Sequence, residues 1–156
     1  MYTWVYGRSA PAFRRPRRLP PLMVTESIDQ RVLAAAGEAI LGCPAVEAAY
    51  LLGSAVAGRL RGDSDIDIAI LPRHSASVSL EDRLLLAAQL GAIFGRQVDL
   101  GILGTRNLVY AKEAIAHGRL FAERDHSVTA RFAMHVLSMY AALQEARREV
   151  LRAYSA

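Results

Sequence analysis

Residues 65–71 constrain the fold most, because they combine an alternating strand pattern with two closely spaced carboxylates. Ile66, Ile68 and Ile70 fall on one face of the predicted strand, and Asp65 and Asp67 fall on the other. Two like charges side by side repel each other and resist burial, so folding alone gives no reason for them. Mg²⁺ would supply that reason, because it binds paired carboxylates and fills its remaining positions with water and phosphate oxygens.

A short apolar run and a Gly-Ser pair come before this strand. Residues 48–52 are predicted to form a strand, and Gly53 ends it in a turn. Gly53 would let the backbone approach a phosphate chain closely, and Ser54 would begin a short helix whose free N–H groups attract anions. Without the aspartates, a helix-capping serine after a turn glycine would be the simpler interpretation.

A third carboxylate lies in a later predicted strand, residues 97–103. Asp99 falls on the opposite face from the apolar residues of that strand, together with Gly101. If the two aspartate-bearing strands are neighbours, Asp99 joins Asp65 and Asp67 on one surface, which is the arrangement that a two-metal phosphoryl-type transfer needs. Taken alone, Asp99 is explained equally well as a solvated strand residue.

The Gly53-Ser54 pair, a ten-residue spacer and Asp65-x-Asp67 together form a pattern that resembles the nucleotidyltransferase superfamily with the DNA-polymerase-beta-like fold. Within it, the chain looks most like the minimal nucleotidyltransferase (MNT) proteins, which are antitoxin partners of HEPN toxins. The resemblance implies an α+β fold, with a small mixed sheet flanked by helices and a long C-terminal helix.

The resemblance also implies catalytic and metal-binding roles. Asp65 and Asp67 would bind metal, and Asp99 would complete the site next to the nucleophile, whose proton it would accept. The implied cofactor is Mg²⁺, with two ions expected, and the implied co-substrate is ATP.

Four further residues are expected to bind the nucleotide. Gly53 and Ser54 would hold the triphosphate, and Arg59 and Arg61 would contact the leaving pyrophosphate through charge-assisted hydrogen bonds. The two arginines would replace one that many relatives carry where this chain has Ala57. Loop arginines are also commonly just solvated, and that interpretation stays open for both.

The predicted function is the transfer of AMP from ATP to a tyrosine of a cognate HEPN ribonuclease toxin. One alternative is a small-molecule nucleotidyltransferase of the aminoglycoside type, although such chains usually add a sizeable C-terminal domain and only about fifty residues follow Leu103. The other is a non-catalytic antitoxin that neutralises the toxin by binding alone. The expected mark of that alternative is a lost carboxylate, and all three are present.

The basic character of the chain belongs to its first residues. The formal net charge is +4, but five of the 19 Lys and Arg residues lie within residues 1–25, which leaves 14 against 15 acidic residues. Direct nucleic-acid binding is therefore not expected. Residues 1–22, rich in Pro and Arg, are predicted to be a disordered tail or an extension upstream of a natural start at Met23. Residues 23–156 are predicted to form one nucleotidyltransferase domain.

Localisation and the remaining elements follow from simpler signals. Cys43 is the single cysteine and there is no run of 18 apolar residues, so we expect a cytoplasmic protein without a membrane span. Capping signals predict helices from Thr25 or Ser27 to about 41, from Ser79 with Asp82 to about 94, and from Thr105 to about 116. A short strand is expected over 119–123.

The last predicted helix, residues 125–154, has an apolar stripe. The stripe residues are four and three positions apart in alternation: Phe132, Val136, Met139, Leu143, Ala146 and Val150. We expect the first half of the helix to pack on the sheet. The second half carries three arginines, and we expect it to dock a partner protein in a hetero-oligomer.

Overall fold

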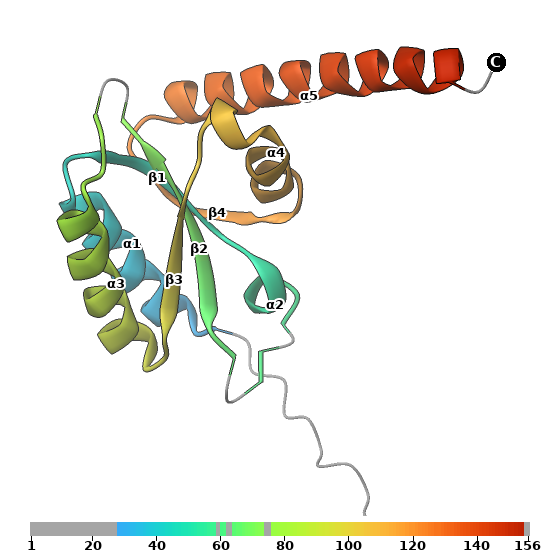
Figure 1. The fold of residues 1–156 in the computed structure, drawn as a ribbon. Coiled ribbons are helices and arrows are strands. Elements are labelled where there is room, and N and C mark those ends of the chain that lie inside the picture. Colours follow the sequence, from blue (N-terminus) through green and yellow to red (C-terminus); the bar gives the residue numbers. More distant parts are fainter. Residues whose placement is uncertain (1–27, 59, 62–63, 74–75, 155–156) are drawn as a thin grey trace, which may run out of the picture.

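The structure is a computed structural model of the chain, and it describes residues 28–58, 60–61, 64–73 and 76–154. The predicted tail over residues 1–22 lies outside the described residues. Figure 1 shows the elements in chain order: α1 (Gln30–Gly42), β1 (Val46–Leu51), α2 (Gly53–Val56), β2 (Ile66–Pro72), α3 (Leu80–Phe94), β3 (Val98–Ile102), the 3₁₀ helix η1 (Thr105–Asn107), α4 (Leu108–His117), β4 (Arg119–Glu123) and α5 (His126–Tyr154).

The four strands form one mixed sheet in the order β3-β2-β1-β4. β2 and β3 run parallel, whereas β1 is antiparallel to both β2 and β4. Helices α1 and α3 lie on one face of this sheet, and α4 and α5 lie on the other (Figure 1). The expected α+β fold, with a small mixed sheet flanked by helices and a long C-terminal helix, is confirmed.

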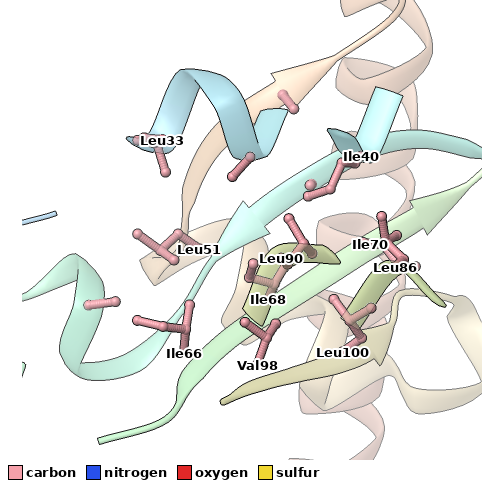
Figure 2. Close-up of a cluster of buried hydrophobic side chains, with 14 of the residues drawn as sticks. Leu33, Ile40, Leu51, Ile66, Ile68, Ile70, Leu86, Leu90, Val98 and Leu100 are labelled. Carbon is pink, nitrogen blue, oxygen red and sulfur yellow. The ribbon is translucent and has the colours of Figure 1, made fainter. Parts of the chain in front are cut away.

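The apolar face of β2 forms the main core with α1 and α3. Ile66, Ile68 and Ile70 are each at most 1% exposed, and Figure 2 shows Ile68 and Ile70 beside Leu90 and Leu86 of α3. Burial of each such side chain stabilises the fold by about 1.5–3 kcal/mol. The alternation read from the sequence therefore fixes which face of β2 is buried.

The opposite face of the sheet is only partly covered. Ala69 and Leu71 of β2 are buried there with Ala111 of α4 and Val136 of α5. Two residues before Ala69 along β2, Asp67 is exposed. The polar strand residues thus lie where the cover of α4 and α5 has ended.

Helix boundaries agree with the capping signals in one case and differ in two. Ser79 and Asp82 form the predicted capping box, and Gly95 ends α3 in a left-handed conformation. The cap predicted at Thr25 or Ser27 is wrong, because Asp29 caps α1 by accepting from the Arg31 N–H at 2.8 Å.

The start predicted for the fourth helix also differs. Thr105 begins a 3₁₀ turn, and α4 begins three residues later. Asn107 is its cap and accepts a hydrogen bond from the Tyr110 N–H at 3.3 Å. The amide of Asn107 is better placed to bind a free N–H of the first α-helical turn than the Thr105 hydroxyl is.

Helix α5 packs on the domain through its first half only. Thr129 and Val136 are buried, whereas every residue from 141 to 154 except Gln144 is exposed. Figure 1 shows this second half running out past the sheet and α4. Among the described residues, no helix combines the length and apolarity that a membrane crossing requires.

Candidate active site

Two carboxylates face each other across the parallel pair of strands. Asp67 of β2 and Asp99 of β3 are register partners, and both are exposed. Neighbouring strands lie about 4.8 Å apart and register partners point to the same face, so the two side chains share one surface. That surface is the one whose far end is covered by α4 and α5.

Asp65 precedes β2 by one residue and is also exposed. Partial burial raises the pKa of Asp67 above 3.8, and the negative charges of Asp99 and then Asp65 raise it further. Asp99 and Asp65 therefore both lie close enough to Asp67 to repel its charge. A cation that binds beside Asp67 would offset this repulsion.

The Gly-Ser turn lies directly against Asp67. The Leu52 N–H donates to the backbone carbonyl of Asp67 at 2.9 Å, which joins the end of β1 to the start of β2. Gly53 follows with a φ of +61°, and a β-carbon built on it would lie 3.0 Å from Asp67 Oδ2. A glycine is thus needed at position 53 both for its backbone conformation and for the space beside the carboxylate.

The other predicted nucleotide-binding residues are only partly described. Ser54 is half-buried in the four-residue helix α2, next to Gly53. Arg61 is exposed, and its N–H donates to Ser64 Oγ at 3.2 Å in the turn before Asp65. Arg59 lies outside the described residues. The turn that carries Arg61 therefore leads directly into the carboxylates, and the position of Arg59 is not described.

Tyr110 of α4 is a site neighbour that the sequence reasoning missed. A β-carbon built on Gly101 would overlap the Tyr110 hydroxyl oxygen and lie 2.7 Å from Cζ, so the ring tip rests on the glycine. Burial raises the pKa of Tyr110, and the charges of Asp99 and Asp67 raise it further. The available signal was Gly101 itself, because a glycine inside a strand often marks a close approach by another group.

The carboxylate oxygens at this site are the type of ligand that a hard cation such as Mg²⁺ binds, although the side chains do not form a complete metal site. Across the described part of the chain, no three His, Cys, Asp or Glu side chains are grouped so that they could hold a metal ion. Asp67 and Asp99 form a pair that supplies carboxylate oxygens, the ligands that Mg²⁺ takes together with water and phosphate. A two-carboxylate site that is completed by substrate phosphates fits this arrangement.

The family of the chain follows from comparison with known proteins. The family model described as polymerase beta, nucleotidyltransferase matches residues 39–127, which include the carboxylates and the Gly-Ser turn. The chain belongs to this nucleotidyltransferase family. The family prediction made from the Gly-Ser and Asp-x-Asp pattern is confirmed, and the protein is a nucleotidyltransferase. A search of curated proteins found no match.

Two of the solved structures that share this fold are toxin–antitoxin complexes. One, described as a toxin–antitoxin with AMP-PNP, is 25% identical with a TM-score of 0.63, and the match covers 83% of this chain and 100% of that one. Another, a tri-AMPylated HEPN toxin from Shewanella oneidensis in complex with an MNT antitoxin, is 24% identical with a TM-score of 0.62 and the same coverage. The similarity to MNT proteins expected from the sequence is confirmed.

Proposed function

We propose that this nucleotidyltransferase transfers AMP from ATP to a tyrosine hydroxyl of a cognate HEPN toxin and so acts as its antitoxin. The observation that carries the proposal is the register pair of Asp67 and Asp99 beside the Gly53 turn. The kind of partner and nucleotide is supported by the 25% identical structure, a toxin–antitoxin complex with AMP-PNP.

In this mechanism Asp67 and Asp99, the two carboxylates of the register pair, have different roles. The backbone at Gly53 and Ser54 holds the triphosphate on the β1 side, where no Cβ obstructs it. Asp65 and Asp67 lie next to this turn, whereas Asp99 lies on the edge strand β3, farther from it. Asp99 would receive the proton of the acceptor hydroxyl, and Arg59 and Arg61 would contact the pyrophosphate.

Mg²⁺, with two ions expected, would be held by Asp65, Asp67 and Asp99. When bound, it would supply positive charge that stabilises the charge developing on the phosphoryl oxygens. Burial and then the charges of Asp99 and Asp65 raise the pKa of Asp67, and a bound cation would offset those charges, which supports this assignment.

The partner is proposed to dock on the second half of α5. This segment exposes four large apolar side chains: Leu143 38%, Val150 55%, Leu151 63% and Tyr154 87%. An isolated helical segment of this length is only marginally stable as a helix in water, so a partner that packs on it would stabilise the helix. The four-and-three spacing of the stripe suits a helical partner, as expected for a hetero-oligomer with an all-helical toxin.

The test has a genetic and a chemical part. We expect the neighbouring reading frame to encode a helical protein with an Arg-x₄₋₆-His motif, and this HEPN protein is the partner used in all assays below. Purified partner is incubated with the chain, ATP and Mg²⁺, and its intact mass and tyrosine peptides are measured. Gain of AMP on a tyrosine is the expected result.

Two variants separate catalysis from simple binding. Asp67→Asn keeps the shape of the side chain but removes one charge from the site, so the rate should fall on the order of 10²-fold or more. Glu81→Gln removes an exposed charge on α3, across the sheet from the site, and should leave the rate unchanged. A partner that never gains AMP, yet is neutralised equally by wild type and Asp67→Asn, would mean that the chain acts by occlusion.

A further inference from the structure

The hydroxyl of Tyr110 lies at the boundary between the covered and uncovered parts of the sheet face. Tyr110 is in the first turn of α4, whose Ala111 and Ala114 are buried against the sheet. Its ring tip reaches Gly101, which is two residues beyond Asp99 on the same face of β3. The hydroxyl therefore lies on the face of β3 that carries the Asp99 carboxylate.

This hydroxyl has no hydrogen-bond partner among the residues that the structure describes. A phenol keeps its proton at neutral pH, so the oxygen can act as a donor. Asp99 also forms no hydrogen bond or ion pair with any described residue. The hydroxyl at Gly101 and the Asp99 carboxylate therefore lie on the same face of β3, and no hydrogen bond joins them in this structure.

The two carboxylates of the pair have different neighbours. Oδ2 of Asp67 lies against Gly53, on the side of the Gly-Ser turn. Asp99 shares its strand with Gly101, on which Tyr110 rests, and its charge affects the Tyr110 pKa more than that of Asp67 does. Of the two carboxylates, Asp99 is therefore the one on the same strand as the glycine that the hydroxyl contacts.

We propose that Tyr110 is a positioning residue, whose hydroxyl donates a hydrogen bond to Asp99 once ATP and the partner are bound and so orients it toward the acceptor substrate. The inference rests on the proposed function, because it assigns Tyr110 to the side of the site where the acceptor tyrosine enters. With one carboxylate oxygen held by Tyr110, the other faces the incoming hydroxyl and receives its proton. The ATP side of the site, at Gly53, does not involve Tyr110.

The experiment compares Tyr110→Phe with Tyr140→Phe. Tyr110→Phe leaves the ring on Gly101 and removes only the oxygen. Tyr140→Phe makes the same change on α5, where the ring contacts Lys112 (the Nζ lies 5.4 Å from the ring centroid) and not the carboxylates. For each protein, kcat, the KM for ATP, the KM for the partner and the thermal midpoint are measured with Mg²⁺. A crystal structure of the full chain with its partner and AMP-PNP gives the distance from Tyr110 Oη to Asp99.

A positioning role predicts a fall in kcat of about 10-fold for Tyr110→Phe, with the KM for ATP and the thermal midpoint unchanged. It also predicts wild-type kinetics for Tyr140→Phe, and an Oη-to-carboxylate distance of about 2.5–3.0 Å in the crystal. Wild-type kcat for Tyr110→Phe overturns the inference, and so does a fall in kcat that comes with a lowered thermal midpoint.

The same assays separate this inference from the proposed function. If wild type transfers AMP to the partner and Tyr110→Phe does so equally fast, only the role of Tyr110 is wrong. If wild type transfers no AMP, the proposed function fails and the inference fails with it.

Discussion

The backbone of Gly53 and the carboxylate of Asp67 are so close that a β-carbon on Gly53 would lie 3.0 Å from Asp67 Oδ2. Gly58 has the same φ of +61°, but a β-carbon there would have no atom within 4 Å. The two glycines therefore share a backbone conformation that L-residues rarely adopt, and only one of them contacts the site.

Substitution of these two glycines should separate backbone strain from site disruption. Gly53→Ala and Gly58→Ala should each lose about 1 kcal/mol of unfolding free energy, because alanine is strained at positive φ. Only Gly53→Ala should also lose AMP transfer, by roughly 10-fold or more, because its methyl group displaces the Asp67 carboxylate. Denaturant unfolding and the transfer assay measure the two effects. Equal activity in both variants would show that the contact with Asp67 has no functional role.

Burial of Asp67 and repulsion from Asp99 and Asp65 together predict an unusual pH dependence for the metal-free protein. The pKa of Asp67 is raised in the folded state, so the fold binds this proton more tightly than the unfolded chain does. The stability that protonated Asp67 contributes is fully present below about pH 3.8, and it is lost as the pH rises through the raised pKa of Asp67. Asp67→Asn should therefore become progressively more stable than wild type as the pH rises from 3 to 7 in the presence of a chelator.

A carboxylate with the opposite shift provides the control. Hydrogen bonds from the Ser127 side chain and backbone lower the pKa of Asp125. The stability that ionised Asp125 contributes is thus present above about pH 3.8 and is lost as the pH falls through the lowered pKa. Asp125→Asn lacks this contribution, so it should become less stable than wild type as the pH rises. Mg²⁺ should stabilise wild type more than Asp67→Asn. If both variants show the same slope against pH, the repulsion is not the cause.

Much of the fold follows from local patterns in the sequence. The alternation of Ile66, Ile68 and Ile70 fixed the buried face of β2, because a strand has a period of two. Ser79 and Asp82 located the start of α3, because a capping box depends on residues three apart. Helix starts were harder to predict where several polar residues compete for the free N–H groups, as at Thr105 and Asn107.

The site was only partly predictable, because its contacts join distant parts of the chain. The family resemblance pointed to Asp99, but the register that pairs it with Asp67 is a property of the sheet. Tyr110 could not be assigned from spacing, since its contact with Gly101 depends on how α4 packs on β3. Tyr110 was therefore missed because its place in the site depends on a tertiary contact.

Arg124, between β4 and α5, is hydrogen-bonded to the end of α1 and the start of β1. The Arg124 guanidinium donates to the carbonyls of Val46 at 2.7 Å and Cys43 at 2.9 Å, and also to that of Leu41. Arg124→Met should lower the unfolding free energy by about 1–2 kcal/mol, because the end of α1 and the start of β1 lose a shared donor. Arg106→Met, at an exposed position in η1, should have no measurable effect. Similar unfolding free energies for both variants would show that water replaces the guanidinium at no cost.

Removal of the second half of α5 tests where the partner binds. Truncation after Gln144 deletes residues 145–156, and none of the described residues among them is buried. The thermal midpoint and AMP-PNP binding should therefore stay near wild type, whereas affinity for the partner falls by at least about 10-fold because the apolar stripe is lost. Glu145→Gln combined with Arg148→Gln removes an exposed ion pair from the same segment, and should change affinity little. Isothermal titration with the partner and with AMP-PNP measures both affinities on each protein. Parallel loss of partner and nucleotide binding would mean that this half of α5 supports the domain and does not form the docking surface.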